Sequence, residues 1–213
     1  MVGRLAFPDR SPTKTWIKAE ITCEALKPWA FFVTLGPLVS LPLLAVLVQS
    51  LSGAAVDALQ APAGTKAIVF LFTSTDCPIS NRYAPEVQRV VSEFAAKGVV
   101  FRLVYPNPAD QAAAILEHMR AFSYAGAMQA LRDPAHALVR FTKATVTPEA
   151  VVIAGGHVVY RGRIDDRYVD LGVERPAPTQ HDLADALSAV LAGTRVPRAT
   201  TQAVGCFIAD FAR

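Results

Sequence analysis

Residues 66 to 73, KAIVFLFT, are the stretch that most constrains the fold, because positions 67 to 72 are all apolar. A continuous apolar run of this length is typical of a strand buried on both faces, as in the sheets of α/β proteins. Shortly after it, Cys77 and Pro78 mark a change from strand to helix, since proline is favoured in the first turn of a helix. Free N–H groups and the helix dipole at that position favour the thiolate, the nucleophilic form of cysteine. The sequence therefore predicts a thiol site at Cys77.

A helix and a second strand follow this site. Apolar residues recur at helical spacing as far as Phe94, and Lys97-Gly98 is a stop signal. Pro85 falls inside the helix and is expected to kink it, because proline lacks an N–H and its ring crowds the preceding turn. Residues 99 to 105, VVFRLVY, form the next buried strand. Two strands joined by a helix predict a parallel pair with a right-handed crossover.

The downstream sequence alternates between helical and strand patterns. The expected elements are a helix at 110–124 capped by Asp110, a short strand at 128–131, a short helix at 133–141, strands at 150–154 and 157–161 joined by Gly155-Gly156, and a final helix at 181–191. Residues 165 to 179 are polar and contain prolines, which predicts a loop. The last twenty residues, 194 to 213, are expected to be extended or irregular, and they contain Cys206.

The front of the chain is a separate regime, because residues 28 to 56 contain no charged side chain. A basic leader followed by an apolar run and small residues is typical of a cleaved secretory signal. An uncleaved membrane anchor through residues 29–50 is the alternative, since about 20 apolar residues can span a bilayer. A buried helix of the main fold is a third interpretation. Either of the first two places the rest of the chain in the periplasm or another extracytoplasmic compartment.

These features predict five segments. They are a cytoplasmic leader (1–28), a signal sequence or membrane anchor (29–56), a linker (57–64), a main domain (65–193) and a C-terminal tail (194–213). A main domain of this size can be stable without disulfide bonds.

Charge excludes one class of partner. Of the 21 Lys and Arg residues, five lie in residues 1–28 and 16 follow, and of the 18 Asp and Glu residues three lie there and 15 follow. A nearly neutral main domain argues against nucleic-acid binding, which needs clustered basic residues. The sequence also lacks a glycine-rich phosphate loop, a Ser-His-Asp pattern and paired metal-ligand spacing among its four histidines, so no cofactor is expected.

Two of the three cysteines belong to the part predicted to be exported. Cys23 precedes the apolar segment, whereas Cys77 and Cys206 follow it. Disulfides persist outside the cytosol, and an even number of cysteines permits a single pair. Cys206 therefore has three interpretations: a second redox thiol for Cys77, one half of a permanent structural disulfide, or a buried free cysteine that acts as a small apolar residue.

The order of these features resembles the thioredoxin fold. The shared pattern is a strand, a cysteine at a helix start, Pro85 eight residues later, a strand, and Thr147-Pro148 before a hairpin and a last helix. The extra helix at 110–124 and the sequence LRDP before TVTPE resemble the redoxin branch, which contains the alkyl hydroperoxide reductase/thiol-specific antioxidant proteins and the TlpA-like exported oxidoreductases. The resemblance implies a three-layer α/β sandwich, in which helices cover both faces of a mixed sheet. It also implies a cis Thr147–Pro148 bond that faces Cys77 and presents backbone to an extended substrate.

Two departures from these families bear on the chemistry. Dithiol oxidoreductases carry C-x-x-C, but here the motif is Cys77-Pro78-Ile79-Ser80, and Ser80 cannot close a disulfide. The peroxidase pattern has a proline seven residues before the cysteine, where this chain has Phe70, although Ser74 fits.

The resemblance implies an exported thiol-disulfide oxidoreductase that acts on protein thiols or disulfides, a small thiol or a peroxide. Its site would comprise Cys77 as the nucleophile, Cys206 as the resolving thiol, Ser80, and Thr147-Pro148. The alternatives are a divergent thiol peroxidase and a non-catalytic module that binds a peptide or holds a metal through its cysteines.

Overall fold

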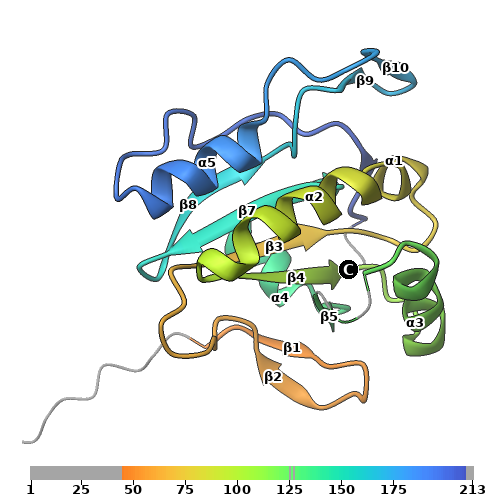
Figure 1. Cartoon of the computed structure of the whole chain (residues 1–213). Helices are drawn as coiled ribbons and strands as arrows, with labels where there is room; N and C mark the ends of the chain where they lie inside the picture. The colour runs from red at the N-terminus through yellow and green to blue at the C-terminus, as the bar shows by residue number, and fades with distance from the viewer. Residues whose placement is uncertain (1–44, 125, 127, 210–213) are drawn as a thin grey trace, which may run out of the picture. The chain divides into compact units, whose positions relative to one another are not determined.

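The computed structural model describes residues 45–124, 126 and 128–209 (Figure 1). All of them belong to one compact unit of the chain. The predicted leader at 1–28, the start of the predicted signal or anchor at 29–44, and Cys23 lie outside the described residues.

A seven-stranded mixed sheet forms the centre of this unit, in the order β2-β1-β5-β4-β3-β7-β8. Its strands are β1 (Leu47–Gln49), β2 (Ala55–Asp57), β3 (Ala67–Phe72), β4 (Val99–Tyr105), β5 (Gln129–Arg132), β7 (Glu149–Ala154) and β8 (His157–Gly162). Strand β3 lies parallel to β4, and β4 lies parallel to β5. On its other side β3 is antiparallel to β7, which forms the predicted hairpin with β8 through Gly155-Gly156. The mixed sheet is confirmed.

Helices cover both faces of the sheet. They are α1 (Pro78–Arg82), α2 (Ala84–Phe94) with the short 3-10 helix η1 (Ala95–Lys97), α3 (Ala112–Ala121), α4 (Ala137–Thr142) and α5 (Asp182–Leu191). Alternate residues of β3 point to opposite faces. Val69 and Leu71 pack in the core that contains residues of α2, α3 and α5, whereas Phe70 and Phe72 pack in the core that contains α4. Each of these buried phenylalanines contributes about 1.5–3 kcal/mol. The three-layer arrangement is therefore confirmed.

The predicted kink at Pro85 is a complete break. Helix α1 ends at Arg82, α2 begins at Ala84, and Tyr83 joins them with φ −79° and ψ −5°. Proline has no N–H to donate to the carbonyl of Asn81, four residues earlier, and its ring crowds that carbonyl. The short α1 is thereby separated from the long helix that packs on the sheet.

The described unit begins upstream of the predicted domain boundary. Residues 47–49 and 55–57, from the segment expected to be a signal or anchor and the first residue of the expected linker, form the antiparallel strands β1 and β2. Val46 and Val48 are buried in the sheet core. A short apolar run fits a buried strand as well as the end of a signal, so periodicity could not separate them. Within the described part of the chain, no helix is long and apolar enough to cross a membrane.

Two local expectations also change. Asp110 does not cap α3, whose N-cap is Gln111. The stretch 165–179 is not wholly a loop, because it contains the small hairpin of β9 (Tyr168–Asp170) and β10 (Val173–Glu174). The tail, expected to be extended or irregular, contains the extended strand β11 (Cys206–Phe207), which pairs with β6 (Val146–Thr147).

Candidate functional site

Cys77 lies at the junction between the central strand and α1. It is the N-cap of α1, with an extended backbone (φ −80°, ψ 107°), and Pro78 occupies the first helical turn. The N–H of Asn81 donates to the carbonyl of Cys77 at 3.0 Å and closes that turn. Only 2% of Cys77 is exposed. The cysteine is thus fixed just beyond the C-terminal end of the central strand β3 and is shielded from solvent.

Thr147 and Pro148 face this cysteine from the start of β7. Their peptide bond is cis, as the resemblance implies. The Cys77 thiol lies 3.1 Å from the carbonyl oxygen of Thr147, to which it can donate a hydrogen bond. Glu149 stabilises the segment before Thr147, because its carboxylate accepts hydrogen bonds from the backbone N–H groups of Thr145 at 2.7 Å and Val146 at 3.3 Å.

The C-terminal tail brings the second thiol to the same place. Strand β11 is antiparallel to β6, with Cys206 opposite Thr147 and Phe207 opposite Val146. The sulfur atoms of Cys77 and Cys206 are 3.0 Å apart, and both residues are free thiols. The tail therefore brings Cys206 into one cluster with Cys77 and with Thr147, the residue before the cis proline.

Upstream of β11, the tail is held along the outer edge of β8. The N–H of Arg161 donates to the carbonyl of Ala199 at 2.9 Å, and the N–H of Thr201 donates to the carbonyl of Arg161 at 3.1 Å. Arg198 pairs with the buried Asp182 of α5 at 2.9 Å. These contacts fix the tail before it crosses to Cys77, so the placement of Cys206 does not depend on β11 alone.

Ser80 shapes the chemistry of Cys77. Burial of the thiol raises the pKa of Cys77, but the Ser80 hydroxyl, the Cys206 thiol and the Ser80 backbone outweigh burial by favouring the thiolate, so the net pKa lies below its ordinary value. The Ser80 hydroxyl is buried and has no hydrogen-bond partner among the described residues. It is therefore free to donate to the thiolate when Cys77 loses its proton.

The two thiols differ in acidity. Partial burial, the hydrogen bond to Cys77, and the negative charges of Cys77 and Asp76 raise the pKa of Cys206 to about 11. Cys77 is thus the sulfur that carries negative charge more readily, and Cys206 is the one that keeps its proton. Such an asymmetric pair is suited to thiol–disulfide exchange, in which the lower-pKa thiol is the better leaving group.

Comparison with solved structures decides the fold. An uncharacterized conserved protein from Geobacillus kaustophilus superposes with a TM-score of 0.68 at 22% identity, over 79% of this chain and 90% of that chain. A hypothetical protein from Sinorhizobium meliloti 1021 gives a TM-score of 0.65 at 21% identity, over 79% and 92%. MTB dsbF, in its mixed oxidized and reduced forms, gives 0.50 at 20% identity, over 69% and 96%. The fold is thioredoxin-like. No protein-family model and no curated protein matches the chain.

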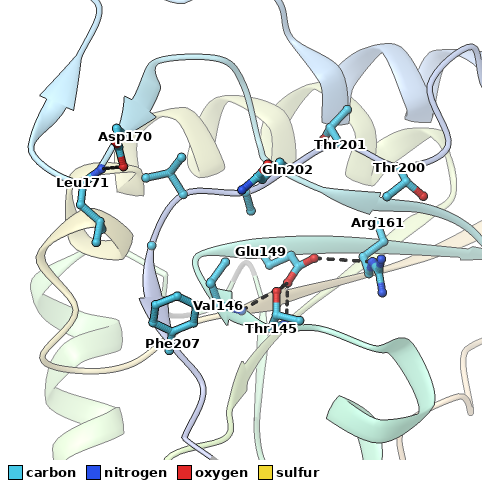
Figure 2. Close-up of a pocket in the computed structure, with 13 residues that line it drawn as sticks. Thr145, Val146, Glu149, Arg161, Asp170, Leu171, Thr200, Thr201, Gln202 and Phe207 are labelled. Carbon is cyan, nitrogen blue, oxygen red and sulfur yellow. Dashed lines mark hydrogen bonds and ion pairs between the residues drawn. The ribbon is translucent and has the colours of Figure 1, made fainter.

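In this thioredoxin-like domain, cavities flank both sides of β11. One has a volume of about 210 Å³ and is lined by Asp76, Cys77, Thr147 and Cys206 among others. The other has a volume of about 450 Å³ and lies between the tail, β8 and the C-terminal end of β9. Its walls include Glu149, Arg161, Leu171, Gln202 and Phe207 (Figure 2). Phe207 borders both cavities and is 82% exposed. Strand β11 therefore lies between the two cavities, and Cys206 lines the smaller one.

Two residues that support the thiol loop were missed at the sequence level. The buried carboxylate of Asp110 accepts hydrogen bonds from the hydroxyls of Ser74 and Thr75, and so ties the loop before Cys77 to the loop before α3. His118 links α3 to α1: its lowered pKa, caused by burial, fits a neutral ring that donates to Asn81 and accepts from Tyr105. In a sequence, an aspartate near a helix start is typical of a helix cap, and a histidine on an apolar helix face is typical of the core. Neither pattern is specific for a residue that supports a thiol site.

Two other polar groups of the described residues make contacts that do not involve the sulfur pair. Arg82 is exposed and pairs with Glu174 of β10 at 3.4 Å. Among the described residues, a group that could together ligate a metal ion is Glu86, Asp165 and His181, but Asp165 already accepts a hydrogen bond from Tyr83 at 2.7 Å. That group includes neither cysteine, so it gives no support to a metal held by Cys77 and Cys206.

Proposed function

We propose that the protein is a thiol-disulfide oxidoreductase whose redox couple is Cys77 and Cys206. The observation that carries the proposal is the 3.0 Å separation of the two sulfur atoms beside the cis Thr147–Pro148 bond. Oxidation joins the sulfurs in a disulfide and passes two electrons and two protons to a partner disulfide, which becomes two thiols. Reduction reverses the exchange. To close the bond, the two sulfur atoms must approach from 3.0 Å to the disulfide length of about 2.05 Å.

Ser80 has a role of its own in this proposal. It stands where a C-x-x-C protein has its second thiol, and that thiol comes instead from Cys206 on the tail. The buried Ser80 hydroxyl favours the Cys77 thiolate, and a lowered pKa raises the thiolate fraction available for exchange. The local motif thus supplies activation, while the tail supplies the partner sulfur.

The fold is consistent with this chemistry. One of the similar structures, MTB dsbF, is described in mixed oxidized and reduced forms, so a protein of this fold exists in two redox states. The predicted export signal adds support, because a stable protein disulfide requires an oxidising compartment. We propose that the domain acts in the periplasm or another extracytoplasmic compartment, on protein thiols and disulfides.

Insulin reduction and peroxide consumption test the proposal with four proteins. These are the full chain, Cys77→Ser, Cys206→Ser, and Cys23→Ser as the matched control. The expected result is insulin reduction by the full chain and by Cys23→Ser, with loss in both other variants. If the full chain reduces insulin no faster than Cys77→Ser, the enzymatic proposal fails. Peroxide consumption that depends on Cys77, without insulin reduction, would identify a thiol peroxidase instead.

A further inference from the structure

The two cysteines of the couple differ in their exposure to solvent. Cys77 is 2% exposed, whereas Cys206 is exposed. Cys77, at the start of α1, is thus the buried member of the pair, and Cys206, on the tail, is the member that an approaching partner can reach. An exchange reaction requires direct attack along the S–S axis, so access decides which sulfur is attacked.

The tail covers Cys77 tightly. Gly205 packs so closely on Thr147 that an added Cβ would lie 2.1 Å from the Thr147 carbonyl oxygen. One residue past β11, the N–H of Ile208 donates to the carbonyl of Thr145 at 3.0 Å. Val204 and Ile208 pack against the two cores on opposite faces of the sheet. The strand is therefore fastened on both sides of Cys206, and the edge of β6 that an extended partner could use is already filled by the chain itself.

We propose that Cys206, rather than Cys77, is the sulfur that exchanges with partner thiols, and that Cys77 is the internal leaving group and internal nucleophile. This inference rests on the proposed function. In the oxidised protein an external thiolate attacks Sγ of Cys206, the Cys77–Cys206 bond breaks, and Cys77 departs as a thiolate. The product is a mixed disulfide between Cys206 and the partner. A second external thiolate then attacks the partner's sulfur, which releases Cys206 and a partner disulfide.

The same steps run in reverse when the reduced protein reduces a partner. The Cys206 thiol passes its proton to the Cys77 thiolate, 3.0 Å away, and the resulting Cys206 thiolate attacks the partner disulfide. This attack forms the mixed disulfide and releases one partner thiolate, which takes the proton back from Cys77. Cys77 then attacks Sγ of Cys206, which expels the partner thiolate and closes the internal bond. In each direction one S–S bond breaks for each one that forms, and no further oxidant is required. The acidity order supports these roles, because the lower-pKa Cys77 is the better leaving group of the two.

The surroundings of Cys206 fit a thiol carried by a polypeptide. Phe207, its neighbour, is 82% exposed, and Leu171, which lines the larger cavity together with Phe207, is 58% exposed (Figure 2). Exposed apolar side chains next to a reactive group provide contact area for apolar residues of a partner. A small thiol such as glutathione shares the attacking chemistry but would use little of this surface.

The test locates the mixed disulfide. The full chain with Cys23→Ser, so that Cys77 and Cys206 are its only cysteines, is oxidised, mixed briefly with glutathione or with a cysteine-containing apolar peptide, quenched in acid, alkylated and mapped by mass spectrometry. The expected adduct lies on Cys206, with Cys77 alkylated, and forms faster with the peptide. An adduct on Cys77, or equal adducts on both cysteines, overturns the inference and leaves the redox couple intact. Absence of the internal disulfide before thiol is added would instead overturn the proposed function.

Two single-cysteine variants give an independent test of the same inference. Replacing Cys77 by Ser leaves Cys206 without an internal nucleophile, so a mixed disulfide formed with oxidised glutathione should persist. Replacing Cys206 by Ser leaves Cys77 beneath an intact tail, and this variant should acquire glutathione far more slowly. Rapid glutathionylation of the Cys206→Ser variant, with its fold unchanged by circular dichroism, would also overturn the inference.

Discussion

Gly205 lies against the carbonyl of Thr147 so closely that a Cβ on this glycine would meet the oxygen at 2.1 Å and the carbon at 2.6 Å. Thr147 precedes the cis proline, and Gly205 precedes Cys206. The absence of a side chain at one position therefore allows the tail to place its sulfur beside Cys77. The relationship makes the closed arrangement of the site sensitive to a single methyl group.

Gly205→Ala should loosen the tail without unfolding the domain. Forcing a methyl group into a packed contact costs about 1–3 kcal/mol, and the tail can relieve that cost by moving away. In a Cys206→Ser background, we expect alkylation of Cys77 to become about tenfold faster or more, since 1.4 kcal/mol corresponds to a factor of ten. The matched control is Gln202→Ala, at an exposed position of the same tail. Equal alkylation rates in both variants would show that the tail does not shield Cys77.

Ser80→Ala should raise the pKa of Cys77 toward its ordinary value. The variant removes a buried hydroxyl that favours the thiolate, so the lower of the two thiol transitions, followed by ultraviolet absorbance of the thiolate, moves to higher pH. Ser80→Thr keeps the hydroxyl and should retain the lowered pKa. A transition that stays in place in Ser80→Ala would remove Ser80 from the site chemistry.

The same shift predicts how stability depends on pH. The folded pKa of Cys77 lies below the ordinary value of 9.0. Its contribution to the stability of the reduced protein is therefore present above 9.0 and is lost as the pH falls through the folded value. Urea denaturation of the reduced protein should show this rise as the pH approaches 9.0 from below, and the rise should be smaller in Ser80→Ala. Above 9.0 the raised pKa of Cys206 lowers the stability of both proteins, so the comparison is made below that pH. An equal rise in both proteins would contradict the assignment.

Ser80→Cys should divert the disulfide. A thiol at position 80 stands one helical turn from Cys77, whereas Cys206 must be delivered by a tail. After oxidation and alkylation, peptide mapping should find Cys77 linked to the new thiol and Cys206 alkylated. If Cys77 remains linked to Cys206 in the oxidised variant, the prediction is wrong, and Cys206 is the better placed of the two partners for Cys77.

Glu149→Ala should destabilise the loop that carries Thr147. The buried carboxylate accepts the N–H groups of Thr145 and Val146, and leaving a buried donor unpaired costs about 1–3 kcal/mol. We expect the free energy of unfolding to fall by about 2–4 kcal/mol in urea denaturation. Glu149→Gln keeps an acceptor oxygen and should lose less. A loss in Glu149→Ala no larger than that in Glu149→Gln would contradict the role of these hydrogen bonds.

Much of the fold follows from sequence patterns because the patterns are local. The apolar run at 67–72 determines a strand buried on both faces, Pro85 determines a helix break, and Gly155-Gly156 determines a hairpin. The N-terminal edge strands are different. An apolar run such as 45–49 has the same composition at the end of a signal as in a buried strand, and only the pairing of β1 with β5 distinguishes the two.

The site depends on contacts that local patterns do not encode. Cys77 and Cys206 are 129 positions apart, and the tail between α5 and Cys206 has neither helical nor strand periodicity that would reveal where it docks. Asp110 shows the same limit on a smaller scale. Its position predicts a helix cap, but the hydroxyls of Ser74 and Thr75, brought close by the fold, compete successfully for its carboxylate.

Disulfide mapping of the oxidised full chain decides whether Cys77 and Cys206 form the redox couple. The protein is equilibrated with excess oxidised glutathione, alkylated without reduction, digested and examined by mass spectrometry. If Cys77 and Cys206 form the redox couple, the digest contains two peptides joined through these cysteines, and the two peptides separate on reduction. Recovery of Cys77 and Cys206 as separate alkylated or glutathionylated peptides, from protein that still reduces insulin, would contradict this prediction.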